Sequence, residues 1–240
     1  MISKTRLTEL VKVWDWQAVA RGLDENPKLL GHRDERGRNW LHLCSSIDLT
    51  AHPRLDAAAS IKLAELLLAR GLDLNAPAFT EGTWHATPLW YAIGRGHNLK
   101  LAAFLLKRGC NPNHALWAAG FNRDLDAIRV LVKHGADLDP VTEGDTPFLF
   151  AVKWSHFDAA ELLLDLGANV DFRDRKGMTA LHYMLRKGSA IEHLEMIVRH
   201  GARGDIADAK GQTAAAIMSR KREPRFKKLA ERLKRGQRGP

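Results

Sequence analysis

Cysteine is scarce in this chain of 240 residues, and so are long apolar runs. The two cysteines, Cys44 and Cys110, cannot build a disulfide framework or a multi-cysteine zinc site, and they fit a reducing compartment. No uninterrupted apolar stretch approaches the ~18 residues that a membrane-spanning helix needs. Residues 1–20 also lack the continuous apolar core of a secretory signal. We therefore expect a cytoplasmic protein without an integral membrane segment.

Most of the chain is nearly neutral, and the excess of positive charge lies in its C-terminal part. Residues 1–170 hold 19 Lys and Arg against 20 Asp and Glu, whereas residues 171–240 hold 18 against 8. Such a tail attracts nucleic acid, acidic protein or an anionic lipid surface, and it is equally typical of a solvated last helix. The basic residues that define this tail are Arg220, Lys221, Arg222, Arg225, Lys227 and Lys228.

An internal repeat organises the rest of the sequence. Apolar runs end in glycines that lie 38, 26, 32 and 34 residues apart, at Gly71, Gly109, Gly135, Gly167 and Gly201. A second element alternates with these runs. It reads Asn39-Trp40-Leu41-His42, Thr87-Pro88-Leu89-Trp90, Thr146-Pro147-Phe148-Leu149, Thr179-Ala180-Leu181-His182 and, in degenerate form, Thr213-Ala214-Ala215-Ala216.

These elements resemble the ankyrin repeat, whose pattern is a Thr-Pro-Leu-His start, two antiparallel helices and a Gly-Ala-Asp loop that leads into a β-turn. The segment Gly135-Ala136-Asp137-Leu138-Asp139 matches the loop, and residues 174–182 match the turn and the start. The resemblance covers about residues 34–217. It implies an all-α, ankyrin-type helical repeat solenoid with short β-turn fingers and helical caps, slightly curved and built from about five units.

Elementary physical chemistry predicts the same boundaries. Thr87, Thr146 and Thr179 are good helix N-caps, and a glycine after an apolar run suits a left-handed C-terminal cap. One apolar helix pair cannot bury its own surface, so neighbouring units must stack. We expect a cap repeat over residues 1–33, the repeats over residues 34–218, and a basic capping helix and tail over residues 219–240, with a helix opened by Pro224.

The period is broken at three places, where loops are expected to carry function. An excess of 10 or 11 residues enlarges the loop between the helices of the first unit, at Ile47–Ala58. The finger at residues 75–86 is long, with a turn signal at Glu81-Gly82, and the next one, at Cys110–His114, is nearly missing. This predicts a step in the concave face lined by Trp84, Arg95, Phe121 and Asn122, unless Trp84 folds back over the gap.

The sequence predicts a binding module and no reaction centre. Further projecting residues are expected on inner helices and finger tips, in a mixture of Trp, Met and Arg that hot spots favour. They are Lys153, Trp154, Arg175, Lys176, Met178, Arg186 and Lys187. Trp154 has the alternative of packing against its own helix pair.

The eleven histidines follow the repeat and show no metal-ligand or catalytic spacing, so we expect no catalytic residue, metal or cofactor. The chain is interpreted as a monomeric, non-enzymatic protein-interaction module of adaptor, inhibitor or immunity type whose partner has an acidic surface. The alternative is electrostatic docking of the basic tail on nucleic acid or an anionic membrane. An enzyme hidden in the repeats is the third and weakest hypothesis.

Overall fold

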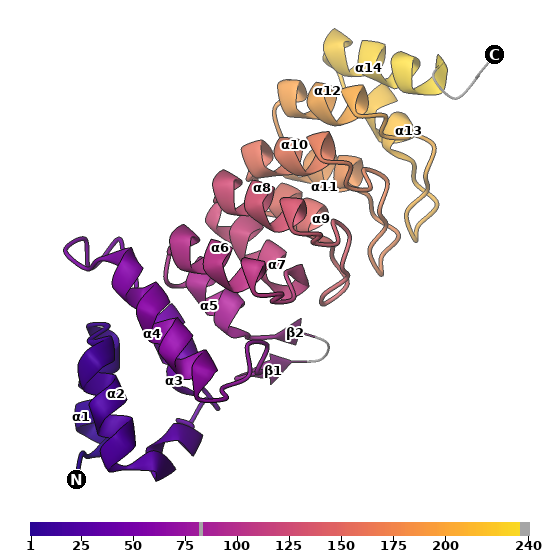
Figure 1. Cartoon of the computed structure of the whole chain (residues 1–240). Coiled ribbons are helices and arrows are strands. Elements are labelled where there is room, and N and C mark those ends of the chain that lie inside the picture. Colours follow the sequence, from indigo (N-terminus) through magenta and orange to yellow (C-terminus); the bar gives the residue numbers. More distant parts are fainter. Residues whose placement is uncertain (82–83, 236–240) are drawn as a thin grey trace. The chain divides into compact units, whose positions relative to one another are not determined.

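The computed structural model describes residues 1–81 and 84–235, without the side chains of Thr80, Glu81, Trp84 and Arg235. The chain divides into two compact units. Unit 1 holds residues 1–122 and 129–136, and unit 2 holds residues 123–128 and the chain from Asp137 on. Both units are stacks of short antiparallel helices, as Figure 1 shows.

Unit 1 begins with a helix pair and continues with three repeats. Its elements are α1 (Lys4–Lys12), α2 (Trp16–Glu25), the 3-10 helix η1 (Pro27–Gly31), α3 (Trp40–Ser45), α4 (Ala57–Ala69), β1 (Thr80–Glu81), β2 (Trp84–His85), α5 (Pro88–Gly94), α6 (Leu99–Lys107) and α7 (Asn113–Asn122). The first helices of successive repeats, α3, α5 and α7, pack side by side, and α2, α4 and α6 do the same behind them. Residues of α8 (Leu125–Lys133) belong partly to each unit.

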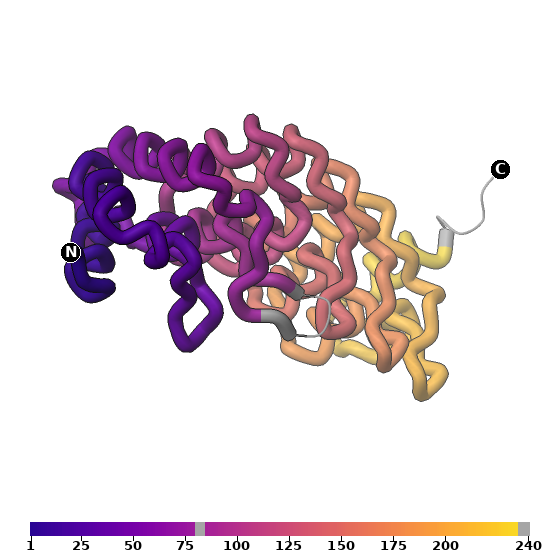
Figure 2. The backbone as a smooth tube through the Cα atoms, turned by 60° about the horizontal axis from the view of Figure 1, so that its bottom comes forward, coloured from indigo at the N-terminus to yellow at the C-terminus, as the bar shows by residue number. Residues whose placement is uncertain are grey.

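Unit 2 repeats the same arrangement toward the C-terminus. Its elements are α9 (Pro147–Lys153), α10 (Phe157–Asp165), α11 (Ala180–Lys187), α12 (Ile191–Arg199), α13 (Ala214–Ser219) and α14 (Pro224–Arg235). Helices α9, α11 and α13 form the inner row, and α10, α12 and α14 form the outer row. The fingers before α9, α11 and α13 lie side by side along one edge of the unit (Figure 2).

Helix ends fall where the sequence predicts them. The hydroxyl of Thr87 accepts the amide of Trp90 at 3.3 Å, and the hydroxyl of Thr146 accepts the amide of Leu149 at 3.2 Å. All five closing glycines have positive φ, between 83° and 103°, which side chains with a Cβ resist. The ankyrin-type, all-α fold with short fingers is confirmed.

The N-terminal helix pair and the C-terminal helix also form as expected. The break in the N-terminal pair falls at Trp14, which has a φ of 54°, is buried, and donates its indole N–H to the carbonyl of Cys44 at 2.9 Å. In α14 the predicted apolar side packs inward, with Phe226, Leu229, Ala230 and Leu233 all buried. Burial of each such large side chain contributes about 1.5–3 kcal/mol, so both ends are held by packing.

The predicted departures from the repeat period are present in the structure. The enlarged loop lies between α3 and α4. The long finger forms a two-stranded antiparallel ladder in which Thr80 pairs with His85 and Glu81 with Trp84. Beyond α6 the chain passes from Gly109 into α7 within four residues, so the next finger is nearly absent, as predicted. No helix of the described chain is both long enough and apolar enough to cross a bilayer.

Candidate functional site

Where the fourth residue of the start motif is a histidine, it ties an inner helix to the following finger. In unit 2 the amide of Thr179 donates to Nδ1 of His182 at 3.2 Å, and Nε2–H of His182 donates to the carbonyl of Gln212 at 3.0 Å. In unit 1 His42 holds the long finger in the same way, through a 2.9 Å bond to the carbonyl of Ala76. These two histidines are therefore structural, as the sequence predicts.

Burial sets the protonation of His42. The ring is fully buried, and burial lowers the pKa of His42 to about 4, although the hydrogen bond to Ala76 acts in the opposite direction. A neutral imidazole at neutral pH suits a structural link and not a proton carrier. Two other predicted scaffold histidines, His134 and His200, accordingly bond with Nδ1 to the carbonyls of Val130 and Met196, one turn earlier.

The repeat that precedes the missing finger carries Trp90 at this motif position. The segment that follows this repeat, Cys110 to Pro112, passes into α7 without forming a finger. The indole of Trp90 instead lies half-buried on α5, in edge-on contact with Tyr91 at 5.0 Å between ring centroids. The lost finger thus exposes an aromatic surface on α5 and α7.

Two adjoining hollows form on this surface, and we call them together the aromatic groove. One, of about 550 Å³, is lined by Asp48, Trp90, Gly94, Arg95, His97, Trp117, Ala118, Phe121 and Asn122. The other, of about 310 Å³, is lined by Arg36, Phe79, Trp90, Tyr91 and Arg95. Trp90 and Arg95 border both hollows. Phe79 and Phe121 keep 48% and 50% of their surface exposed, which is unusual for aromatic side chains beside a cavity.

The predicted step coincides with the larger hollow. Arg95, Phe121 and Asn122 line it together. The amide of Asn122 donates to the carbonyls of Ile93 and Gly94 at 3.3 Å each, so this residue joins the end of α7 to the end of α5. The fourth predicted residue, Trp84, has its side chain outside the described residues. Sequence reasoning missed Trp90 and Trp117, although an aromatic residue at the motif histidine position was a usable signal.

The predicted residues of unit 2 divide into paired and exposed ones. Nζ of Lys153 lies 2.6 Å from Oδ1 of Asp145 and 3.6 Å from Oδ2 of Asp174. The same ammonium group lies 4.3 Å from the centre of the Tyr183 ring, and the hydroxyl of Tyr183 donates to Asp174. Burial alone would lower the pKa of Lys153, but its hydrogen bonds to Asp145 and Tyr183 outweigh this and raise the pKa. Lys153 is thus an internal link between repeats and not the projecting cation that we expected.

Lys187 has a similar role one repeat later. Its ammonium group donates to the carbonyl of Lys153 at 2.6 Å and to the hydroxyl of Ser155 at 2.8 Å. Arg175 is exposed, and its stem lies over the finger glycine Gly144. Trp154 keeps 56% of its surface exposed, with its ring 5.9 Å from that of Phe150.

The remaining three predicted residues of unit 2 line one hollow of about 590 Å³, which we call the cation-rimmed hollow. They are Lys176, Met178 and Arg186. Met178 is buried, with 8% exposed, because its amide donates to Asp174 and turns the residue back from the finger tip, where we expected it. The lining consists of Lys176, Met178, His182, Leu185, Arg186, Asp208, Ala209, Lys210, Gln212 and Ile217. Lys210 was missed, although Asp208-Ala209-Lys210-Gly211 repeats Asp174-Arg175-Lys176-Gly177 after 34 residues.

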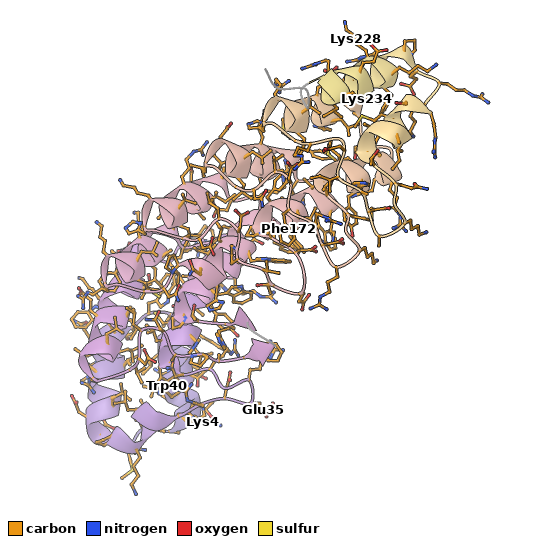
Figure 3. All side chains as sticks on the ribbon, turned by 90° about the vertical axis from the view of Figure 1, so that its right-hand side faces the viewer. Lys4, Glu35, Trp40, Phe172, Lys228 and Lys234 are labelled. Atoms are coloured by element: carbon orange, nitrogen blue, oxygen red, sulfur yellow. The ribbon has the colours of Figure 1, made fainter. Side chains whose placement is uncertain are left out.

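The basic tail forms the outer surface of the last helix pair. Arg222, Lys227, Lys228, Arg232 and Lys234 are exposed, and Figure 3 shows Lys228 and Lys234 on α14. Arg225 pairs with Glu192 of α12 at 2.9 Å, and the ammonium of Lys221 lies 5.7 Å from the centre of the Phe226 ring. Arg220, at the end of α13, is exposed as well.

No group of three or more His, Cys, Asp and Glu side chains within the described residues is arranged to hold a metal ion. Both cysteines are buried free thiols, and burial raises the pKa of Cys110 to about 12. A thiol with such a pKa stays protonated at neutral pH and is a poor nucleophile.

Comparison with known proteins identifies the class. A family model described as ankyrin repeats in three copies matches residues 101–174 and 116–208, and an ankyrin repeat model matches residues 84–115. Together these matches cover more than half of the chain, which therefore belongs to the ankyrin repeat family. Ankyrin repeats are generally protein-interaction modules and are typically non-catalytic.

Two curated relatives match part of the chain. Phosphocholine transferase AnkX of Legionella pneumophila is 31% identical over 140 residues, which are 53% of this chain and 14% of that protein. Ankyrin repeat and SOCS box protein 6 of Mus musculus is 29% identical over 159 residues, 60% of this chain and 37% of that protein. The chain thus spans well under half the length of either relative.

Solved structures show the same fold. The ankyrin repeat domain of Bcl-3, a member of the IkappaB protein family, matches with a TM-score of 0.73 and 22% identity, over 94% of this chain and 97% of that one. The ankyrin repeat domain of human ASB11 matches with a TM-score of 0.67 and 20% identity over the whole of both chains.

Proposed function

We propose that this chain is a non-enzymatic protein-interaction module, an adaptor, inhibitor or immunity-type partner, which binds another protein through the inner helices and fingers of its repeats. The aromatic groove carries this proposal. It combines aromatic rings with an arginine, the residue types that dominate binding hot spots, in a hollow where a partner side chain is desolvated. Arg95 is exposed beside Phe121, so an anionic partner group beside an apolar anchor fits it best.

The positive charge of unit 2 indicates the charge expected on the partner's surface. The basic excess of residues 171–240 favours an acidic partner surface over unit 2, and such complementary charge mainly speeds association. The proposal includes Arg175, Lys176 and Arg186 as the accessible cations of this face, with Trp154 as an exposed aromatic. We further propose a reducing, cytoplasmic setting, a monomeric state, and the division into residues 1–33, 34–218 and 219–240.

Affinity capture with matched variants tests this proposal. The purified chain is immobilised, exposed to a lysate of its native cell, and the retained proteins are identified by mass spectrometry. The variant Arg95→Glu with Phe121→Ala removes the charge and the aromatic ring of the groove. Its control, Lys100→Glu with Val13→Ala, makes the same change of charge and truncates an exposed apolar side chain elsewhere in unit 1.

The expected result is a protein that the parent and the control retain and the groove variant loses. All variants must first show the same cooperative thermal unfolding by circular dichroism. If all three chains retain the same proteins in the same amounts, the groove is not the binding surface. Removal of the chain beyond Ser219 then decides whether the tail binds them.

A second candidate function rests on α14. Its exposed face carries Lys227, Lys228, Arg232 and Lys234 against the acidic side chains of Glu223 and Glu231. This is the footprint of electrostatic docking on nucleic acid or on an anionic membrane surface. The salt dependence of binding distinguishes the two functions. Polyanion binding falls steeply between ~0.05 and ~0.5 M salt, whereas binding through the aromatic groove persists.

A further inference from the structure

The cation-rimmed hollow of unit 2 has an apolar floor. Met178 and Leu185, 8% and 5% exposed, form it together with the half-buried Ile217. They come from a finger, from α11 and from α13, so the floor spans two successive repeats. A volume of about 590 Å³ lies within the usual range of ligand sites and exceeds what one side chain fills.

Hydrogen bonds hold the walls of this hollow in place. The amide of Ala209 donates to the carbonyl of Lys176 at 2.9 Å, which joins the two fingers, and Nη2 of Arg173 donates to the carbonyl of Ala207 at 3.0 Å. Gly177 has a φ of 69°, and a Cβ there would lie 3.0 Å from the amide nitrogen of Ala209. The close approach of the fingers thus requires glycine. A site with fixed walls loses little conformational entropy on binding.

The rim of the hollow is cationic. Lys176 stands on one finger, Lys210 on the next and Arg186 on α11, and all three side chains are exposed. Among the described residues that line the hollow, one carries a carboxylate: Asp208, whose Oδ1 accepts the amides of Lys210 and Gln212 at 2.8 and 2.9 Å. This carboxylate is therefore engaged by its own turn, and the three cations face the space above the floor.

We propose that the cation-rimmed hollow binds an acidic peptide segment that carries one apolar anchor residue. The anchor enters between Met178, Leu185 and Ile217, and carboxylates on either side of it pair with Lys176, Arg186 and Lys210. This proposal rests on the proposed interaction function, and it assigns unit 2 its partner chemistry. A single-stranded nucleic acid fits less well, because the described residues of the lining include no Phe, Tyr or Trp on which a base could stack.

Fluorescence anisotropy with three dye-labelled peptide pools tests the proposal at 0.15 M salt. The first pool has the sequence Gly-Asp-Glu-Xaa-Glu-Asp-Gly, with Leu, Met or Phe at the central position. The second has Ser at that position, and the third has Lys in place of every acidic residue. We expect the parent chain to bind the first pool at least tenfold more tightly than the second, and not to bind the third.

Two variants with matched controls locate the binding. Lys176→Glu with Lys210→Glu reverses the charge of two rim residues, and we expect it to weaken binding of the first pool at least tenfold. Lys227→Glu with Lys228→Glu makes the same change of charge on α14 and should alter affinity less than twofold, because neither lysine lines the hollow and salt screens exposed charges. Ala209→Trp places a large side chain into the hollow from an exposed position and should obstruct binding, whereas Ala209→Ser should preserve it.

The proposal is overturned if the parent binds none of the pools, if it binds the first two equally, or if Ala209→Trp binds like the parent. The first result excludes an acidic ligand, and the second shows attraction of any polyanion. These outcomes are distinct from a failure of the proposed function. If the captured partner is still lost when Arg95 and Phe121 are changed, only the assignment of the hollow is wrong.

Discussion

Two repeats, one from each unit, place different chemistry at the fourth position of the start motif. In unit 2 the fourth motif residue is His182, which is buried and bonded to the finger that follows. In unit 1 the corresponding residue after the long finger is Trp90, which has no finger to hold and borders two hollows. Beside the missing finger this position thus carries an aromatic side chain that borders two hollows, whereas in unit 2 two intact fingers border a hollow with a cationic rim.

The difference teaches where binding energy is available. In unit 2 several polar side chains are committed to neighbouring repeats, as in the cluster of Lys153, Asp145, Asp174 and Tyr183. In unit 1 the groove residues Phe79 and Phe121 keep about half of their surface for a partner. Substitutions should therefore cost stability in the first group and affinity in the second.

The largest predicted effect concerns the pH dependence of unit 1. The pKa of His42 is about 4 in the folded chain and about 6.5 in the unfolded one, so the unfolded state binds the proton more readily. Stability from this residue is complete above pH 6.5 and is lost as the pH falls toward 4, by up to about 3 kcal/mol. Urea unfolding at pH 7.5 and pH 4.5 should show this loss in the parent and a smaller one in His42→Asn.

His200 of unit 2 provides the contrast to His42. Hydrogen bonds to Asp165 and to the carbonyl of Met196 raise its pKa, so its contribution is complete below pH 6.5 and disappears as the pH rises past the raised value. His200→Asn should therefore lose stability at acidic pH and little at alkaline pH.

If the parent and His42→Asn respond equally to acid, His42 is protonated in the fold and bonds through Nδ1 to Oδ1 of Asn39, 2.7 Å away.

The next effect in size concerns the Lys153 cluster. Lys153→Met removes the cation between Asp145 and Asp174, whose side chains are only 16% and 7% exposed. Leaving two poorly hydrated carboxylates unpaired should lower the free energy of unfolding by about 2 kcal/mol. Chemical denaturation measures this loss. The double variant Lys153→Met with Asp145→Asn should recover part of it, and equal stability of parent and single variant would show that the cluster contributes nothing.

A smaller effect, on affinity alone, is expected in the aromatic groove. Phe121→Ala should weaken binding of the captured partner by about 1–2 kcal/mol, which isothermal titration calorimetry can measure. Its unfolding free energy should change by less than about 0.5 kcal/mol, because half of the side chain is already exposed. A variant with lower stability and unchanged affinity would assign Phe121 to the packing of α7.

The smallest effect is expected on α14. Lys228→Glu with Lys234→Glu changes exposed positions of the cap, so stability should shift by no more than about 0.5 kcal/mol. Equilibrium affinity for the partner should stay within twofold, and only the association rate should fall, most clearly at low salt. Loss of binding in stopped-flow measurements at 0.15 M salt would favour electrostatic docking through the tail.

The sequence predicts the fold well because each boundary depends on local chemistry. Thr87 and Thr146 cap helices, and Gly71 and Gly201 end them, whatever surrounds the repeat. The long and missing fingers could also be counted from the spacing. The step residues Arg95 and Phe121 were expected from that count, and the structure places them at the C-terminal ends of α5 and α7, where both line the larger hollow.

The parts that sequence reasoning missed depend on contacts between repeats. A lysine on an inner helix, such as Lys153, is predicted to project, and only the structure shows that Asp145 and Asp174 meet it. The place of Met178 in the hollow follows from a turn that pulls its amide toward Asp174. The place of Trp90 between two hollows depends on how α5, α7 and the long finger pack together, which the motif alone does not reveal.

Hydrogen–deuterium exchange of the chain with and without its captured partner tests the central claim most directly. Recognition through inner helices and fingers predicts slower exchange in the complex at residues 88–95 and 113–122 of unit 1 and at residues 174–187 and 207–217 of unit 2. Exchange in the outer helices α4, α6, α10 and α12 and in α14 should be unchanged. Protection confined to α14, or to the outer helices, would contradict the account.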